Sequence, residues 1–170
     1  MRKYEGERAQ TYDQKREGNK PYQWQQSIVE KVLSRHQPVL VMDAPVGTGR
    51  FFPVYEKLGC SVVGLDISQD MLDIALAKAK KVNCVLVLVR EDLFEVKWLH
   101  FVVSTRFFGH LNKTDKRKFL DKVNHRLLIS HRPEDYQYFK PAKLTIIETH
   151  EYEDGRHCIS LVERSGDIRS

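Results

Sequence analysis

The sequence has few cysteines and no long apolar run. Its 170 residues include three cysteines, an odd number without paired spacing, which excludes a disulfide framework and favours reduced cytosolic thiols. No apolar stretch approaches the roughly 20 residues of a membrane span, and none follows the basic start of the chain. We therefore expect no membrane association, no secretory signal and a cytoplasmic location.

A metal-ligand cluster is also missing. His150, His157 and Cys158 do not provide four donors at the compact spacing that a tetrahedral zinc site needs, so we expect no metal. The chain length suits a single domain of residues 1–170. Within it we expect an N-terminal arm over residues 1–26, a βα core over 27–130, and a loop with a β-hairpin over 131–170.

Strand and helix patterns alternate along the core. Short continuous apolar runs, typical of strands buried on both faces, alternate with helical spacings, which predicts an α/β fold with a mostly parallel sheet between helices. Asp154-Gly155 predicts a terminal hairpin that adds an antiparallel edge. The expected strands are 39–42, 61–65, 85–89, 98–104, 127–130, 143–152 and 156–163, and the expected helices are 27–37, 50–58, 68–81 and 112–127.

Three acids and a glycine-containing turn follow the first three strands. Gly47 and Gly49 let the turn after the first strand bend tightly and approach a ligand. Asp43, Asp66 and Asp92 stand at the ends of the first, second and third strands. Because the carboxyl ends of parallel strands meet at one edge, these acids are expected to line one crevice, and a nucleotide-like ligand is expected there.

Two common nucleotide-binding patterns do not fit this turn. The dinucleotide fingerprint requires a third glycine where the chain has Phe52. A phosphate-binding loop requires Gly-Lys-Ser/Thr, but Gly49 is followed by Arg50 and Phe51.

The motifs resemble those of class I S-adenosylmethionine-dependent methyltransferases. Residues 41–51 are similar to the family's first motif, with Pro45 in place of the first glycine, and residues 63–72 are similar to its second. Residues 90–93 and 102–111 resemble the third motif and the fourth-strand segment. The resemblance implies a Rossmann-like, doubly wound sheet of about seven strands, and S-adenosylmethionine as cofactor with S-adenosylhomocysteine as product.

The same resemblance implies the roles of single residues. Asp66 would bind the ribose, and Tyr12 is expected to close over the cofactor. The remaining cofactor contacts implied are Asp43, Ala44, Pro45, Gly47, Thr48 and Gly49 for the methionine part, Ile67 and Met71 beside the adenine, Asp92 and Leu93 at its amino edge, and Ser104 beneath the sulfonium.

Two residues after the fourth strand are candidates for catalysis. His110 is expected to face the crevice as a general base, and the alternative is a histidine that packs at a helix start. Arg106 would bind an acidic substrate or pair with a local carboxylate. The chain has no Asn-Pro-Pro-Tyr run and no Pro-Cys pair, which disfavours methylation of exocyclic amino groups and of cytosine C5.

The basic charge is concentrated in residues 113–126. The chain carries 28 basic and 23 acidic residues, a net charge of +5, and this segment alone has six basic and two acidic residues. An amphipathic helix with a solvated basic face is one interpretation, and a surface for RNA or DNA is the other.

The sequence therefore favours a methyltransferase acting on a small molecule, and two alternatives stay open. One is an RNA or DNA methyltransferase that uses the basic segment. The other is a non-catalytic cofactor-binding protein that needs a partner chain or a second copy, because the segments 93–100 and 130–141 leave little room for a substrate cap.

Overall fold

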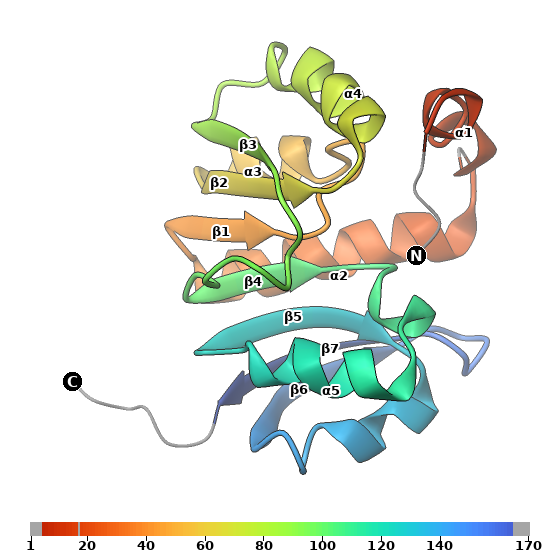
Figure 1. The fold of residues 1–170 in the computed structure, drawn as a ribbon, viewed down its shortest axis with the longest axis vertical. Coiled ribbons are helices and arrows are strands. Elements are labelled where there is room, and N and C mark those ends of the chain that lie inside the picture. Colours follow the sequence, from red (N-terminus) through yellow and green to blue (C-terminus); the bar gives the residue numbers. More distant parts are fainter. Residues whose placement is uncertain (1–4, 17, 165–170) are drawn as a thin grey trace.

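Seven strands form one mixed sheet in the order β3-β2-β1-β4-β5-β7-β6. The computed structural model describes residues 5–16 and 18–164. The predicted α/β, Rossmann-like fold, with a mostly parallel sheet and an antiparallel C-terminal hairpin, is confirmed (Figure 1). The parallel strands are β1 (Leu40–Asp43), β2 (Ser61–Asp66), β3 (Leu86–Arg90), β4 (Phe101–Ser104) and β5 (Arg126–His131), and the hairpin pairs β6 (Leu144–Glu151) with β7 (Cys158–Arg164).

Helices cover both faces of this sheet. Figure 1 shows α5 in front of the strands and α2 behind them. The described helices are α1 (Glu7–Gln10), α2 (Lys20–His36), α3 (Phe52–Leu58), α4 (Gln69–Ala79) and α5 (Lys113–Asp121), with 3₁₀ turns η1 (Gln14–Arg16), η2 (Phe108–His110) and η3 (Pro133–Tyr138). None of the described helices is long and apolar enough to cross a membrane.

Side-chain alternation along the strands produces two apolar cores. Val103 of β4 packs with α2, α3 and α4, whereas its neighbour Val102 packs with α5 and η3 on the other face. Leu128 and Leu127 of β5 divide between the two cores in the same way. Strands β1, β4 and β5 are therefore buried on both sides, as their continuous apolar runs predict. The same prediction is wrong for β3, which lies at the sheet edge and leaves Val87 51% exposed.

Helix α2 begins at Lys20, seven residues before the predicted start at Ser27. The Asn19 side chain caps it by accepting a hydrogen bond from the Tyr22 N–H, and Pro21 occupies the first turn, where its missing N–H costs nothing. The arm thus forms α1, η1 and the first turns of α2. Residues 1–4 and 17 of the predicted arm lie outside the described residues.

Strand β4 begins at Phe101, three residues later than predicted. Trp98 is buried but lies off the strand, because its indole N–H donates to the Leu93 carbonyl at 2.9 Å. Its ring packs edge-on against Phe119 with centroids 4.8 Å apart. Tertiary packing has overridden the apolar pattern at this point.

Helix α5 is shorter than the predicted helix over 112–127, because Leu127 belongs to β5. The predicted basic face is correspondingly smaller. Lys116 forms an ion pair with the buried Asp135, Lys122 donates to the Phe94 carbonyl, and Arg126 pairs with Glu163 at 3.2 Å. These three of the six basic side chains are therefore engaged within the fold.

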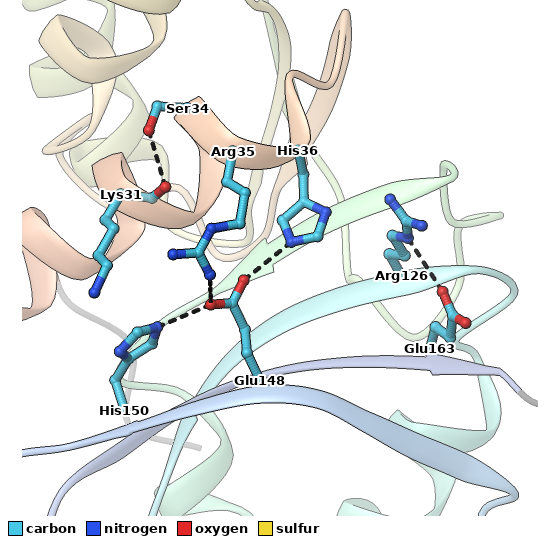
Figure 2. Close-up of polar contacts among 8 residues, drawn as sticks. All are labelled: Lys31, Ser34, Arg35, His36, Arg126, Glu148, His150 and Glu163. Atoms are coloured by element: carbon cyan, nitrogen blue, oxygen red, sulfur yellow. Dashed lines mark hydrogen bonds and ion pairs between the residues drawn. The ribbon is translucent and has the colours of Figure 1, made fainter.

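The end of α2 is attached to the hairpin by one carboxylate. Glu148 of β6 contacts Arg35 at 2.5 Å, His36 at 3.0 Å and His150 at 3.2 Å (Figure 2). The same figure shows the Arg126–Glu163 pair, which joins β5 to β7. These contacts reinforce the backbone pairing that places the hairpin at the sheet edge.

The Lys116–Asp135 pair makes a testable contribution to stability. Asp135 is 1% exposed and also accepts a hydrogen bond from the Arg132 N–H. Lys116→Met removes the cation from a buried carboxylate, so we expect a loss of about 3–5 kcal/mol in the free energy of unfolding by denaturant. The exposed neighbour change Arg117→Met should alter it by no more than about 0.5 kcal/mol. Equal effects of the two changes would contradict this role.

Candidate functional site

A cavity of about 640 Å³ lies at the carboxyl ends of β1, β2, β3 and β4. The strand order reverses between β1 and β4, which is where ligands bind in open α/β sheets. Its volume is in the range of small-molecule sites. The lining residues are Arg8, Tyr12, Arg16, Tyr22, Asp43, Pro45, Val46, Gly47, Thr48, Arg50, Phe51, Leu65, Asp66, Ile67, Ser68, Met71, Glu91, Asp92, Leu93, Thr105, Arg106, Phe107 and His110.

The turn after β1 is held against the end of β2. Gly47 and Gly49 have φ of +55° and +73°, conformations that favour glycine. A Cβ at Gly49 would lie 2.3 Å from the Phe52 ring, so a side chain at position 49 would clash with the first residue of α3. The Val46 N–H donates to the Leu65 carbonyl at 2.7 Å, which places the turn beside the acid that follows Leu65.

Asp66 is fixed by backbone hydrogen bonds at the cavity wall. One of its carboxylate oxygens accepts from the Gly47 N–H at 3.0 Å and the other from the Ser68 N–H at 2.9 Å. Burial raises the pKa of Asp66, and these backbone N–H groups oppose that rise. A further backbone hydrogen bond comes from Ile67, and the carboxylate keeps lone-pair capacity for a ligand hydroxyl.

Asp43 is the most buried acid of the cavity, with 2% of its surface exposed. The Tyr55 hydroxyl donates to its carboxylate at 3.0 Å. Burial raises the pKa of Asp43 from 3.8 to about 7, although the hydrogen bond from Tyr55 and the charge of Arg50 favour the ionised form. Asp43 therefore changes charge near neutral pH.

Three apolar side chains and one acid line the cavity at the ends of β2 and β3. The apolar ones are Ile67, Met71 and Leu93, and the acid is Asp92. One Asp92 oxygen accepts from the Phe94 N–H at 2.9 Å, which fixes the carboxylate. Apolar side chains beside a carboxylate suit a flat aromatic group with a polar edge.

The N-terminal arm covers the cavity through polar contacts. Asp13 accepts a hydrogen bond from the Thr48 hydroxyl at 2.8 Å and pairs with Lys78 of α4 at 2.6 Å. Tyr12, which precedes it, lines the cavity, and the Arg16 guanidinium lies 3.6 Å from its ring centroid. The arm thus connects the turn after β1 to α4.

The β4 side of the cavity is basic and aromatic. Arg106 and His110 are exposed cavity residues after β4, and Arg50, Tyr22 and Phe51 face them from α2 and the turn after β1. Arg106 has a φ of +59°, which is uncommon outside glycine.

Most of the predicted site residues meet at this cavity. Three do not line it: Ala44 and Ser104 are fully buried, and Gly49 supports the turn from behind. The Ser104 hydroxyl has no hydrogen-bond partner among the described residues. Tyr22 and Arg50 were missed as site residues, because Tyr22 reaches the cavity only through the early start of α2.

A methyltransferase domain model matches residues 41–128, about half of the chain. No curated protein gives a significant match. The chain belongs to this methyltransferase family. The prediction of an S-adenosylmethionine-dependent methyltransferase is thereby confirmed, and the acceptor is not determined by the match.

Solved structures of methyltransferases share the fold of this methyltransferase. Magnesium protoporphyrin IX methyltransferase from Synechocystis with bound S-adenosylmethionine is 22% identical, with a TM-score of 0.74 over 85% of this chain and 80% of that one. Its complex with S-adenosylhomocysteine is 19% identical, with a TM-score of 0.73 over 85% of this chain and 83% of that one. An S-adenosylmethionine-dependent methyltransferase from Clostridium acetobutylicum is 12% identical, with a TM-score of 0.71 over 93% of this chain and 98% of that one.

The raised pKa of Asp43 predicts a pH-dependent stability. Between pH 3.8 and about 7 the folded state keeps a proton that the unfolded chain has lost, so the free energy of unfolding falls as pH rises through this window. The Asp43 contribution amounts to at most about 4 kcal/mol. Asp43→Asn keeps an acceptor for Tyr55 and should remove this contribution. The free energy of unfolding by urea, measured for both proteins from pH 4 to pH 8, tests this contribution. The same pH dependence in both proteins would refute it.

Proposed function

We propose that this methyltransferase transfers a methyl group from S-adenosylmethionine to a small-molecule acceptor by in-line displacement. The observation that carries the proposal is the single cavity, which joins the acidic ends of β1, β2 and β3 to the basic, aromatic end of β4. When bound, S-adenosylmethionine supplies an already activated methyl group, and the protein positions the acceptor beside it.

The cavity residues fit this cofactor. Asp66 presents carboxylate oxygens held by two backbone N–H groups, which suits the paired hydroxyls of a ribose. The apolar side chains of Ile67, Met71 and Leu93 suit an adenine, with Asp92 at its amino edge. Asp43, Pro45, Gly47 and Thr48 would hold the methionine part, and Tyr12 would cover it.

His110 is proposed as the general base. It lies on η2 at the basic end of the cavity, and it is the imidazole among the lining residues. A base is needed there when the acceptor atom arrives protonated, and histidine is suited to the task near neutral pH.

A small acceptor is favoured over a nucleic acid by the charges of α5. Three of the six basic side chains of residues 113–126 are engaged inside the fold, which leaves Lys113, Arg117 and Lys118 exposed on the helix. The cavity, by contrast, already combines cofactor-type and acceptor-type side chains in one chain. That combination also favours catalysis over a non-catalytic cofactor-binding role.

Removal of the Asp66 carboxylate should weaken cofactor binding. We expect Asp66→Ala to raise the Kd for S-adenosylmethionine, measured by isothermal titration, by about 10- to 100-fold, because it loses charge-assisted hydrogen bonds. Asp73→Ala, an exposed acid on α4 away from the cavity, is the matched control and should bind as the unchanged protein. Absence of binding by the unchanged protein at high micromolar cofactor would sink the proposal.

His110→Gln tests the general base. We expect kcat, followed as S-adenosylhomocysteine formation, to fall by about 10²- to 10⁴-fold for acceptors that lose a proton, with the Kd for the cofactor unchanged. His125→Gln, a histidine outside this cavity, is the control. A variant with normal kcat would show that His110 only packs.

A further inference from the structure

Two guanidinium groups lie near the ring of Tyr22 at the basic end of the cavity. The Arg50 Cζ lies 4.0 Å from the Tyr22 ring centroid and 4.2 Å from that of Phe51. The Arg106 Cζ lies 6.0 Å from the same Tyr22 centroid. Both arginines line the cavity, so their charges face the same space.

Hydrogen bonds hold the Arg50 side chain and the Arg106 backbone in place. The Arg50 guanidinium donates to the Thr105 hydroxyl at 3.0 Å and lies 3.4 Å from the amide oxygen of Gln25, which is 3% exposed. The Arg106 backbone N–H donates to the Ser130 hydroxyl at 2.6 Å, which supports its positive φ. Strained backbone of this kind clusters at functional sites, where the surrounding structure maintains it.

Neither guanidinium forms an ion pair with a carboxylate of residues 5–16 or 18–164. Burial lowers the pKa of Arg50, and the nearby charge of Arg106 lowers it further. The carboxyl of Asp43, which acts on Arg50 through its charge, is itself only partly ionised at neutral pH because burial raises its pKa to about 7. Two like charges, one of them largely buried, face one cavity, and an anion placed between them would relieve the repulsion.

We propose that Arg50 and Arg106 bind an anionic group of the methyl acceptor, a carboxylate or a phosphate, an inference that rests on the proposed function. The planar guanidinium donates two parallel hydrogen bonds to either group, which makes arginine the side chain suited to this recognition. The rings of Tyr22, Phe51 and Phe107 add apolar surface around the anion. The acceptor is therefore an anion with an apolar or aromatic body.

The anionic group serves as a handle and is not the atom that receives the methyl group. Hydrogen bonds from two guanidinium groups engage the lone pairs of an oxyanion, which lowers its nucleophilicity. The attacking atom is then a separate hydroxyl or amine on the same molecule, on the side of His110. This division lets the two arginines bind charge while His110 faces the reacting atom.

Binding of three ligands that share one ring tests the inference. We would titrate benzoate, phenyl phosphate and the neutral benzamide into protein saturated with S-adenosylhomocysteine, and follow the arginine Nε–Hε signals by NMR. We expect at least one of the two anions to bind at least tenfold more tightly than benzamide, and the tighter one distinguishes carboxylate from phosphate. Arg106→Gln should weaken anion binding at least tenfold, while Arg117→Gln, exposed on α5, should not change it.

Three outcomes would overturn the inference: no binding of either anion, benzamide binding as tightly as the anions, or an unchanged anion Kd in Arg106→Gln. Arg50→Gln is measured as well, and a loss of S-adenosylhomocysteine binding with intact anion binding would assign Arg50 to the cofactor and refute the pair. Normal S-adenosylhomocysteine affinity in Arg106→Gln shows that this variant is folded.

The same titrations are repeated without S-adenosylhomocysteine. A protein that binds the anions but not S-adenosylhomocysteine would refute the proposed function and support the anion site. A protein that binds S-adenosylhomocysteine but not the anions would refute the anion site and leave the proposed function supported.

Discussion

The close approach of β2 to the turn after β1 is the constraint on which the site depends. A Cβ at Gly64 would lie 2.8 Å from the Leu88 side chain and 2.9 Å from that of Val46, so only glycine lets the turn and β3 pack on both sides of β2. The backbone bond from Val46 to Leu65 locks this approach. It brings the Gly47 N–H to the Asp66 carboxylate, and one backbone contact thereby aligns the turn and an acid of the cavity.

The order of the strands separates charges of opposite sign within the cavity. Asp43, Asp66 and Asp92 follow β1, β2 and β3, which are neighbours, whereas Arg106 follows β4 on the other side of β1. Since the strand order reverses at this point, helices do not fill the crevice and both charged ends stay open to ligands. The acids suit a cationic sulfonium nucleoside, and the basic end suits a different molecule. The fold thus divides two binding tasks by topology.

Local patterns predicted the parts of the fold that depend on local chemistry. The turn glycines, the acids at strand ends, the Ser68 cap and the Asp154-Gly155 hairpin are all set by backbone conformation or by short-range hydrogen bonds. The continuous apolar runs predicted the positions of β1, β2, β3 and β5 to within one residue at each end.

The features that were mispredicted depend on tertiary contacts. Trp98 is as apolar as a strand residue but leaves the strand for the Leu93 carbonyl and the Phe119 ring. The start of α2 was assigned to the N-terminal arm, because Asn19 and Pro21 occur in turns as readily as in helix caps. That error hid Tyr22, and with it the aromatic ring beside which Arg50 and Arg106 meet. Side chains from distant segments decide such sites, and no local pattern contains that information.

The arm over the cavity has a kinetic consequence. In the α1 and η1 segments of the arm, Ala9 is the buried residue. Other contacts between the arm and the rest of the domain include the hydrogen bond and the ion pair of the partly exposed Asp13 with Thr48 and Lys78. Neither apolar core includes a residue of α1 or η1. Local opening of these two segments therefore requires no disruption of either core, and we expect ligand exchange beside them to be uncoupled from unfolding of the whole domain.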